Sequence, residues 1–222
     1  MTGVSEPVRL LVVDDDPLVR AGLSSMLSGA PELQLVGEAA DGRQAVAAVR
    51  ELEPDVVLMD IGLPMLDGVA ATEEIRRRGA APEVVMLTTF GSDEHLLRAL
   101  RAGASGYLLK DATPAEIVAA VVKVAAGESV LSPQSTRQLM DHVGAVDADG
   151  RRTSALASLA RLTERERDVV QAVAEGKSNA EVAADLELGI ATVKTHLTNS
   201  LAKLQLTNRV QLALLAHEAG LV

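Results

Sequence analysis

The 222-residue sequence contains no cysteine and no tryptophan, and it has only one phenylalanine and one tyrosine. The absence of cysteine excludes disulfide bonds, thiolate metal sites and cysteine nucleophiles. Because 48% of the residues are nevertheless hydrophobic, the core must be built from aliphatic side chains. Residues 1–8 lack the basic cluster and long apolar run of a signal peptide or membrane span, so we expect a cytoplasmic protein without a membrane partner.

The net charge of −10 disfavours nucleic-acid binding by the chain as a whole. The distribution of charge changes this conclusion. Residues 1–128 carry 11 basic and 20 acidic side chains, whereas residues 161–222 carry 7 basic and 8 acidic ones. Within 190–209 there are two lysines and one arginine but no carboxylate. The sequence therefore predicts an acidic first half and a nearly neutral second half with one locally cationic stretch.

Two hydrophobic periodicities alternate along residues 1–128. Short aliphatic runs are typical of buried strands, and the amphipathic stretches between them are typical of helices. Five strands alternating with five helices predict a doubly wound α/β domain with a five-stranded parallel sheet covered on both faces. The expected strands are 9–13, 33–36, 56–59, 84–87 and 107–109, and the expected helices are 17–27, 43–52, 69–78, 94–102 and 114–125.

The periodicity weakens after residue 128. We interpret residues 129–160 as a linker, with one candidate helix near 134–143. From residue 161 onwards the pattern is only helical, which predicts a small all-α domain over 161–222. Thr163 and Ser178 each precede a glutamate by three residues, the spacing of a capping box that opens a helix.

Two further helices are expected in this domain. One covers residues 190–204, and its helical periodicity groups a buried apolar stripe. The members of this stripe are Ile190, Val193, Leu197, Leu201 and Leu204. Thr207 is expected to cap the last helix.

Polar side chains follow four of the predicted strands at their carboxyl ends. Asp14 and Asp15 follow the first strand, Asp60 the third, Thr88 the fourth and Lys110 the fifth. Ligands of parallel α/β sheets bind at this edge, so these side chains are expected to converge. Clustered carboxylates repel one another unless a cation joins them, and hard oxygen ligands suit Mg²⁺. A carboxylate in such a site can act as a nucleophile towards phosphorus.

At these residues the chain resembles the response-regulator receiver domain, and as a whole it is similar to two-component response regulators of the NarL/LuxR family. The motifs that carry the resemblance are Val13-Asp14-Asp15-Asp16-Pro17, the segments 58–68 and 103–110, and Leu87-Thr88-Thr89. The resemblance implies a flavodoxin-like fold and a transcription factor that is controlled by a sensor histidine kinase.

The resemblance also implies a role for each residue at the rim. Asp60 would accept the phosphoryl group, while Asp14, Asp15, Asp60 and the backbone carbonyl of Gly62 would hold Mg²⁺. Lys110 and the Thr88 hydroxyl would hold phosphoryl oxygens, and Tyr107 would be the rotameric switch that reports phosphorylation. For Asp16 two interpretations stay open, a further acidic group near the metal and an ordinary cap of the first helix.

Residues 162–222 resemble the LuxR-type helix-turn-helix, which places its third helix in the major groove of DNA. The matching segments include Gly176-Lys177-Ser178-Asn179 and Ala191-Thr192-Val193-Lys194-Thr195-His196-Leu197. The candidate DNA-binding residues are Lys194, Thr195, His196, Thr198, Asn199 and Lys203. The implied partners are double-stranded DNA with inverted half-sites, a second copy of the chain when Asp60 is phosphorylated and, as a further candidate, RNA polymerase.

Two other functions compete with this interpretation. A phosphoaspartyl phosphatase or transferase of the haloacid dehalogenase type needs Asp-x-Asp, whereas this chain reads Asp60-Ile61-Gly62. The sequence also lacks a phosphate-binding loop and a dinucleotide fingerprint, so we expect no enzyme. The alternative is a LuxR-type regulator whose receiver acts independently of phosphorylation. The complete set of acidic and lysine residues argues against it.

Overall fold

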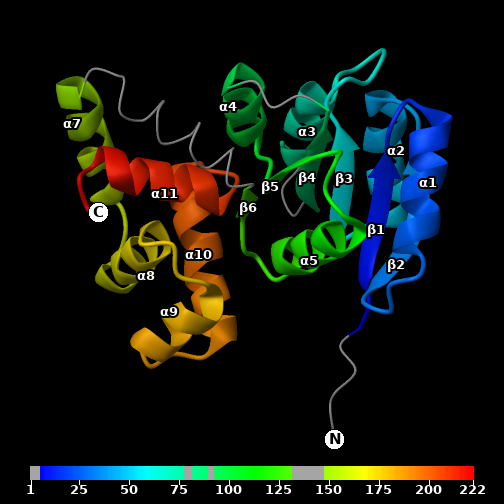
Figure 1. Ribbon diagram of the computed structural model, residues 1–222. Coiled ribbons are helices and arrows are strands. Elements are labelled where there is room, and N and C mark those ends of the chain that lie inside the picture. Colours follow the sequence, from blue (N-terminus) through cyan, green and yellow to red (C-terminus); the bar gives the residue numbers. More distant parts are fainter. Residues whose placement is uncertain (1–5, 78–81, 90–92, 132–147) are drawn as a thin grey trace, which may run out of the picture. The chain divides into compact units, whose positions relative to one another are not determined.

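The computed structural model describes residues 6–77, 82–89, 93–131 and 148–222 (Figure 1). The chain divides into two compact units, Met1–Thr136 and Arg137–Val222, and each is described here by itself. The helix expected near 134–143 lies outside the described residues. None of the helices in the described ranges has the length and apolar character that crossing a membrane requires.

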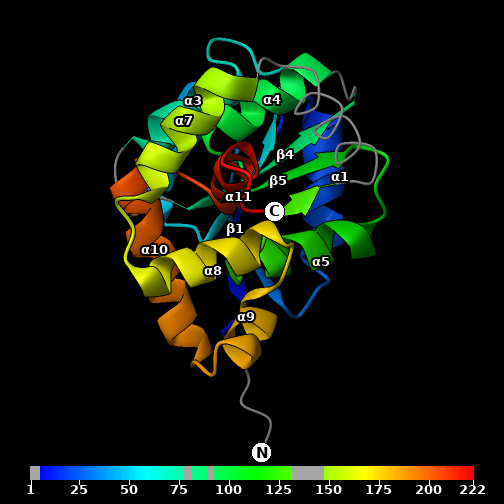
Figure 2. The same ribbon diagram turned by 90° about the vertical axis from the view of Figure 1, so that its left-hand side faces the viewer.

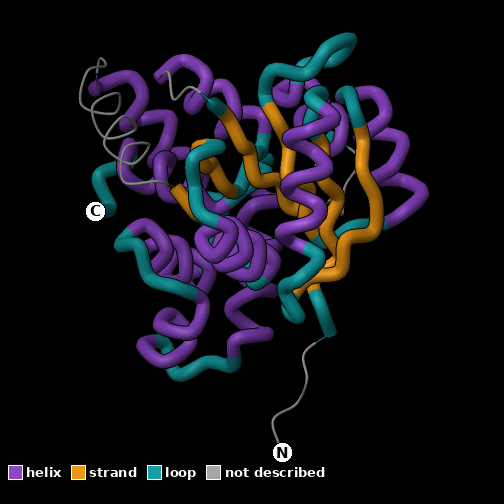
Figure 3. The backbone as a smooth tube through the Cα atoms, turned by 45° about the vertical axis from the view of Figure 1, so that its right-hand side comes forward, coloured by secondary structure: helices purple, strands orange, loops and turns teal. Residues whose placement is uncertain are grey.

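The first unit is built on a parallel sheet with the strand order β2-β1-β3-β4-β5-β6 (Figure 1). The strands of this sheet are drawn in orange in Figure 3. All neighbouring strands run parallel, as the alternating pattern predicted. The strands are β1 (Val8–Val13), β2 (Leu33–Ala39), β3 (Val56–Asp60), β4 (Glu83–Thr88), β5 (Gly106–Leu109) and β6 (Val130–Leu131).

The sixth strand corrects the prediction of five strands and a linker that begins at residue 129. Val130 donates its amide to the carbonyl of Ser105 at 3.1 Å, which places the chain after α5 beside β5. β6 has only two residues and both are half-buried, so it is too short to show any periodicity in the sequence.

The helices of the first unit alternate with the strands and cover both faces of the sheet. α1 packs against α5 on one face, and α3 packs against α2 and α4 on the other (Figure 1). The helices are α1 (Pro17–Leu27), α2 (Gly42–Leu52), α3 (Gly68–Arg76), α4 (Asp93–Ala102) and α5 (Pro114–Ala125). The central strands are buried on both sides, which explains their continuous aliphatic sequence.

The second unit is entirely helical in its described residues (Figure 2). Its helices are α7 (Ala148–Leu159), α8 (Glu164–Ala174), α9 (Asn179–Asp185), α10 (Ile190–Leu204) and α11 (Arg209–Glu218). The capping boxes at Thr163 and Ser178 are both formed, because each side chain accepts from the backbone three residues on and the glutamate there returns the bond.

Three details of the helical unit differ from the prediction. α7 lies inside the expected linker and buries Ala155 and Leu159 in the core of the unit, where α7 packs against α11. Ile190 is the first residue of α10 and is 50% exposed, because it lies at the helix end beyond the packed stripe. Asn208, not Thr207, caps α11 by accepting from the amide of Gln211.

Candidate functional site

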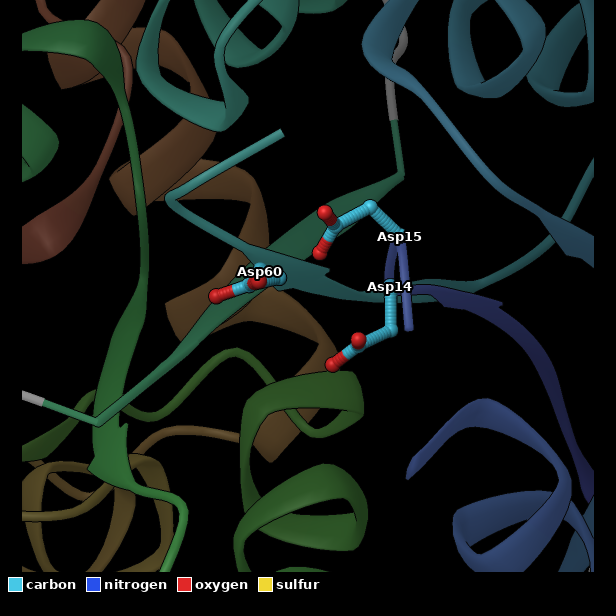
Figure 4. A group of neighbouring side chains, drawn as sticks. All are labelled: Asp14, Asp15 and Asp60. Atoms are coloured by element: carbon cyan, nitrogen blue, oxygen red, sulfur yellow. The ribbon is translucent and has the colours of Figure 1, made fainter. Parts of the chain in front are cut away.

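The structure brings together three carboxylates at the carboxyl ends of β1 and β3. One oxygen from each of Asp14, Asp15 and Asp60 lies within 4.8 Å of the others, and Figure 4 shows the three side chains pointing into a common space. Asp14 is fully buried and Asp60 is 8% exposed, while Asp15 lies open to solvent. β1 and β3 are hydrogen-bonded neighbours, so carboxylates that are far apart in the sequence meet at one edge.

Lys110 neutralises part of this cluster. Its ammonium lies 2.6 Å from Asp14 Oδ2 and 3.0 Å from Asp60 Oδ2. Burial alone would lower the pKa of Lys110, but the two carboxylates outweigh it and raise this pKa. Burial also raises the pKa of Asp14, although Lys110 opposes that shift. Three carboxylates facing one ammonium leave an anionic site of hard oxygen atoms, which fits Mg²⁺ in charge and in ligand type.

Thr88 and Tyr107 lie on neighbouring strands next to this cluster. Thr88 ends β4 and is 6% exposed, and its carbonyl accepts the amide of Lys110 at 2.7 Å. Tyr107 on β5 is completely buried, and its hydroxyl has no hydrogen-bond partner in good geometry among the described residues. Burial raises the pKa of Tyr107, and the nearby Thr88 side chain partly opposes this shift. In this structure the ring of Tyr107 therefore lies inside the fold and not at the surface.

Two glycines lie next to Asp60, and one of them, Gly68, is required by the close approach of the backbone. A Cβ at Gly68 would lie 2.0 Å from the carbonyl oxygen of Asp60, so only glycine lets α3 begin this close to β3. Gly68 also donates its amide to the carbonyl of Ile61 at 3.0 Å. Gly62 is exposed, and a Cβ there would lie 3.9 Å from Asp60 Oδ2, which places this residue beside the carboxylate.

Asp16 serves as the cap of α1. Its Oδ1 accepts from the amides of Leu18 and Val19 at 2.8 and 3.4 Å. Its own amide donates to Asp14 Oδ1 at 3.0 Å. The structure therefore favours the capping interpretation of Asp16, and its backbone rather than its carboxylate supports the acidic cluster.

The second candidate site is the exposed side of α10. Lys194, Thr195, Thr198 and Asn199 are all exposed, and His196 is half-buried. Val193 and Leu197 are buried on the opposite side, as the helical periodicity predicted. Lys194 is the basic member of the exposed set, which gives the face the side chains that can contact phosphates and base edges.

The hydroxyl groups on this face already have partners within the helix. Thr195 donates to the carbonyl of Ala191 and Thr198 donates to that of Lys194, both at 3.0 Å. A threonine side chain whose hydroxyl proton is bonded in this way can offer a ligand only the lone pairs of its oxygen and its methyl group.

Lys203 is engaged inside the helical unit. Its ammonium lies 2.8 and 2.6 Å from the two carboxylate oxygens of Glu166 on α8. Glu166 is 3% exposed and also closes the capping box with Thr163. The Lys203 contact lowers the pKa of Glu166 to about 2, against the opposing effect of burial. This pair could not be predicted from local sequence patterns, because the two residues are 37 positions apart.

Comparisons with known proteins assign each of the two units to a family. Residues 10–122 match the response regulator receiver domain, and residues 160–216 match the luxR family of bacterial regulatory proteins. The chain is 37% identical over 217 residues to the transcriptional regulatory protein LiaR of Bacillus subtilis, covering 97% of this chain and 99% of the relative. It is 34% identical to the nitrate/nitrite response regulator protein NarL of Escherichia coli, covering 96% of each.

A similar solved structure is that of response regulator ChrA of a heme-sensing two-component system. It is 34% identical, covers 98% of this chain and 100% of its own, and has a TM-score of 0.53. The chain thus combines a receiver domain with a LuxR-type DNA-binding domain. It belongs to the family of two-component response regulators that control transcription, and its fold is the flavodoxin-like receiver fold followed by a helical domain.

Proposed function

We propose that Asp60 accepts a phosphoryl group from a sensor histidine kinase and that this switches DNA binding by α10. The observation that carries the proposal is the convergence of Asp14, Asp15 and Asp60 on one space with Lys110 bound to two of them. Such an arrangement has no structural need, because burying like charges costs stability. It is suited to a site that must receive a divalent cation and a phosphoryl group.

Each residue of the site would have its own role in phosphoryl transfer. Asp14, Asp15, Asp60 and the Gly62 carbonyl would hold Mg²⁺, which when bound neutralises phosphoryl oxygens. A carboxylate oxygen of Asp60 attacks phosphorus, the bond from phosphorus to the donor imidazole nitrogen breaks, and the imidazole keeps the electron pair. Lys110 is held at the carboxylate that forms the new bond, where its ammonium can pair with a phosphoryl oxygen.

Thr88 and Tyr107 would convert the added charge into a change of structure. The phosphoryl group adds roughly −1.5 to −2 charges at Asp60. Thr88 lies at the end of the adjacent strand and can turn its hydroxyl to this charge, and Tyr107 lies behind it in the core. A change in the position of the tyrosine ring alters the surface near α4, β5 and α5, and we propose that this surface favours a homodimer when Asp60 is phosphorylated.

The exposed side of α10 would read DNA. Lys194 supplies the cation, Asn199 supplies an amide that can both donate and accept, and Thr195 and Thr198 supply methyl groups and acceptors. A symmetric dimer presents two such helices to inverted half-sites about one helical turn apart. RNA polymerase is a further partner that we propose for the DNA-bound form.

Phosphorylation with acetyl phosphate tests the chemistry. Wild-type protein should be labelled only when Mg²⁺ is present, and Asp60→Asn should abolish the shifted band on a Phos-tag gel. Asp111→Asn is the matched control, because Asp111 is exposed beside Lys110 but lies outside the acidic cluster. Undiminished labelling of Asp60→Asn would refute the assignment. DNA binding that is equal in wild type and Asp60→Asn, with and without acetyl phosphate, would favour a receiver that acts independently of phosphorylation.

A further inference from the structure

Arg20 on α1 makes contacts for which the proposed phosphorylation chemistry has no direct use. Its side chain is only 19% exposed. Its Nη1 donates to the backbone carbonyl of Asp14 at 2.6 Å, and its Nε lies 3.3 Å from Glu38 Oε2. Arg20 therefore connects three elements, α1, the end of β1 and the end of β2.

The carbonyl that Arg20 binds belongs to the peptide group between Asp14 and Asp15. The orientation of this peptide decides how the two carboxylates are directed relative to each other. The backbone turns sharply here. The Asp14 amide still donates to the carbonyl of Ala39 on β2 at 3.2 Å, whereas Asp16 already caps α1. A charge-assisted hydrogen bond from a mostly buried guanidinium is a strong restraint on such a turn.

Glu38 holds the guanidinium from the other side. It lies on β2 opposite Val12 of β1, two positions before Asp14. Glu38 is 41% exposed, so its ion pair with Arg20 adds little stability by itself. Its effect is to orient Arg20 towards the Asp14 carbonyl.

We propose that Arg20 is a positioning residue for the cation-binding carboxylates. By fixing the Asp14–Asp15 peptide, it keeps both side chains directed at Asp60. The proposal rests on the proposed role of these carboxylates in binding Mg²⁺. Arg20 touches neither the cation nor the phosphoryl group, so its loss should weaken Mg²⁺ binding while leaving the reaction at saturating Mg²⁺ nearly unchanged.

The test compares Arg20→Met, Arg20→Lys and Glu38→Gln with wild type. Mg²⁺ binding is measured by isothermal titration calorimetry on the unphosphorylated full chain, and labelling by acetyl phosphate is followed across a series of Mg²⁺ concentrations. Arg20→Met should raise the Mg²⁺ dissociation constant about tenfold, the lower range for a group that orients a metal ligand. Arg20→Lys keeps the positive charge and one donor nitrogen and should recover part of the affinity, and Glu38→Gln should have the smallest effect. The labelling rate at saturating Mg²⁺ should stay within about twofold of wild type.

Arg50→Met is the matched control, because Arg50 is 52% exposed and pairs only with Glu74, at 3.5 Å, among the contacts described for it. It should bind Mg²⁺ as wild type does. A wild-type dissociation constant in folded Arg20→Met overturns the proposal. If Arg20→Met does not fold, the same result in both Arg20→Lys and Glu38→Gln overturns it. Failure of the proposed function would look different, because wild-type protein itself would not be labelled at any Mg²⁺ concentration.

Discussion

Glu166 and Lys203 form an ion pair that joins α8 to α10, with both carboxylate oxygens within 2.8 Å of the ammonium. Glu166 is buried, whereas the Lys203 side chain is 39% exposed. The pair therefore anchors α10, the candidate DNA-reading helix, to α8. It gives Lys203 a structural role that its place on a cationic stretch did not suggest.

The first prediction separates the structural role of Lys203 from a role in DNA binding. Lys203→Met leaves a buried carboxylate with only its capping bonds to Thr163, so it should destabilise the helical unit by about 1–3 kcal/mol. The salt dependence of DNA binding should not change, because no phosphate contact is lost. Urea unfolding and fluorescence anisotropy with labelled DNA at two salt concentrations measure both.

Lys194→Met is the comparison for this experiment. Lys194 is exposed, so its loss should leave stability unchanged. If Lys194 holds a phosphate, the salt slope should fall by about one unit per half-site. A similar fall in Lys203→Met at unchanged stability would show that Lys203 contacts DNA instead.

The second prediction concerns acid stability. The pKa of Glu166 is lowered to about 2 in the folded protein, from an ordinary value of 4.5. A lowered carboxyl pKa contributes stability above the unfolded value, and this contribution is lost as the pH falls from about 4.5 towards 2. The melting temperature of the helical unit should fall in this range, and Glu166→Gln should show a shallower fall. Parallel pH profiles for the two proteins would contradict the assignment.

The third prediction concerns the backbone beside Asp60. Gly68→Ala places a Cβ 2.0 Å from the Asp60 carbonyl oxygen, so α3 must move away from β3. We expect a loss of about 2–3 kcal/mol of stability and slower labelling by acetyl phosphate. Gly22→Ala is the control, because a Cβ at this position in α1 meets no described atom within 4 Å. It should stabilise by about 0.5–1 kcal/mol. Equal stability of both variants would show that the close approach is absent in solution.

The fourth prediction concerns the chemistry of DNA reading. Because the Thr195 proton is bonded to the Ala191 carbonyl, the methyl group is the part of this side chain that can contact a thymine methyl. Thr195→Val should retain affinity for a matched operator selected from a random duplex library. Thr195→Ser should lose about 0.8 kcal/mol, the value of one buried methylene-sized group. The reverse order of the two variants would show that the hydroxyl is read.

The features that the sequence predicted correctly are those that depend on local spacing or on a general rule of sheet geometry. A capping box needs only a hydroxyl residue and a glutamate three positions later. The sequence shows this spacing at Thr163 and at Ser178, and both boxes are formed. The convergence of Asp14, Asp15 and Asp60 could be expected because parallel strands place their carboxyl ends at one edge.

The features that the sequence did not predict depend on contacts between distant residues. β6 exists because two residues fall beside β5, and α7 is stable because Ala155 and Leu159 are buried in the core of the helical unit, where α7 packs against α11. β6 is too short to be recognised on its own, and α7, although it has 12 residues, is too weakly amphipathic.

The sequence by itself determined the two domains, the order of their main elements and the acidic residues that meet at the sheet edge, because aliphatic periodicity and strand-end chemistry are encoded locally. Only the tertiary structure decided how those residues are held. Lys203 pairs with Glu166, and Ile190 is left exposed at the start of α10. Arg20 donates to the carbonyl of the peptide between Asp14 and Asp15. A polar side chain has many partners within its reach, and packing alone selects the one that burial and hydrogen-bond geometry allow.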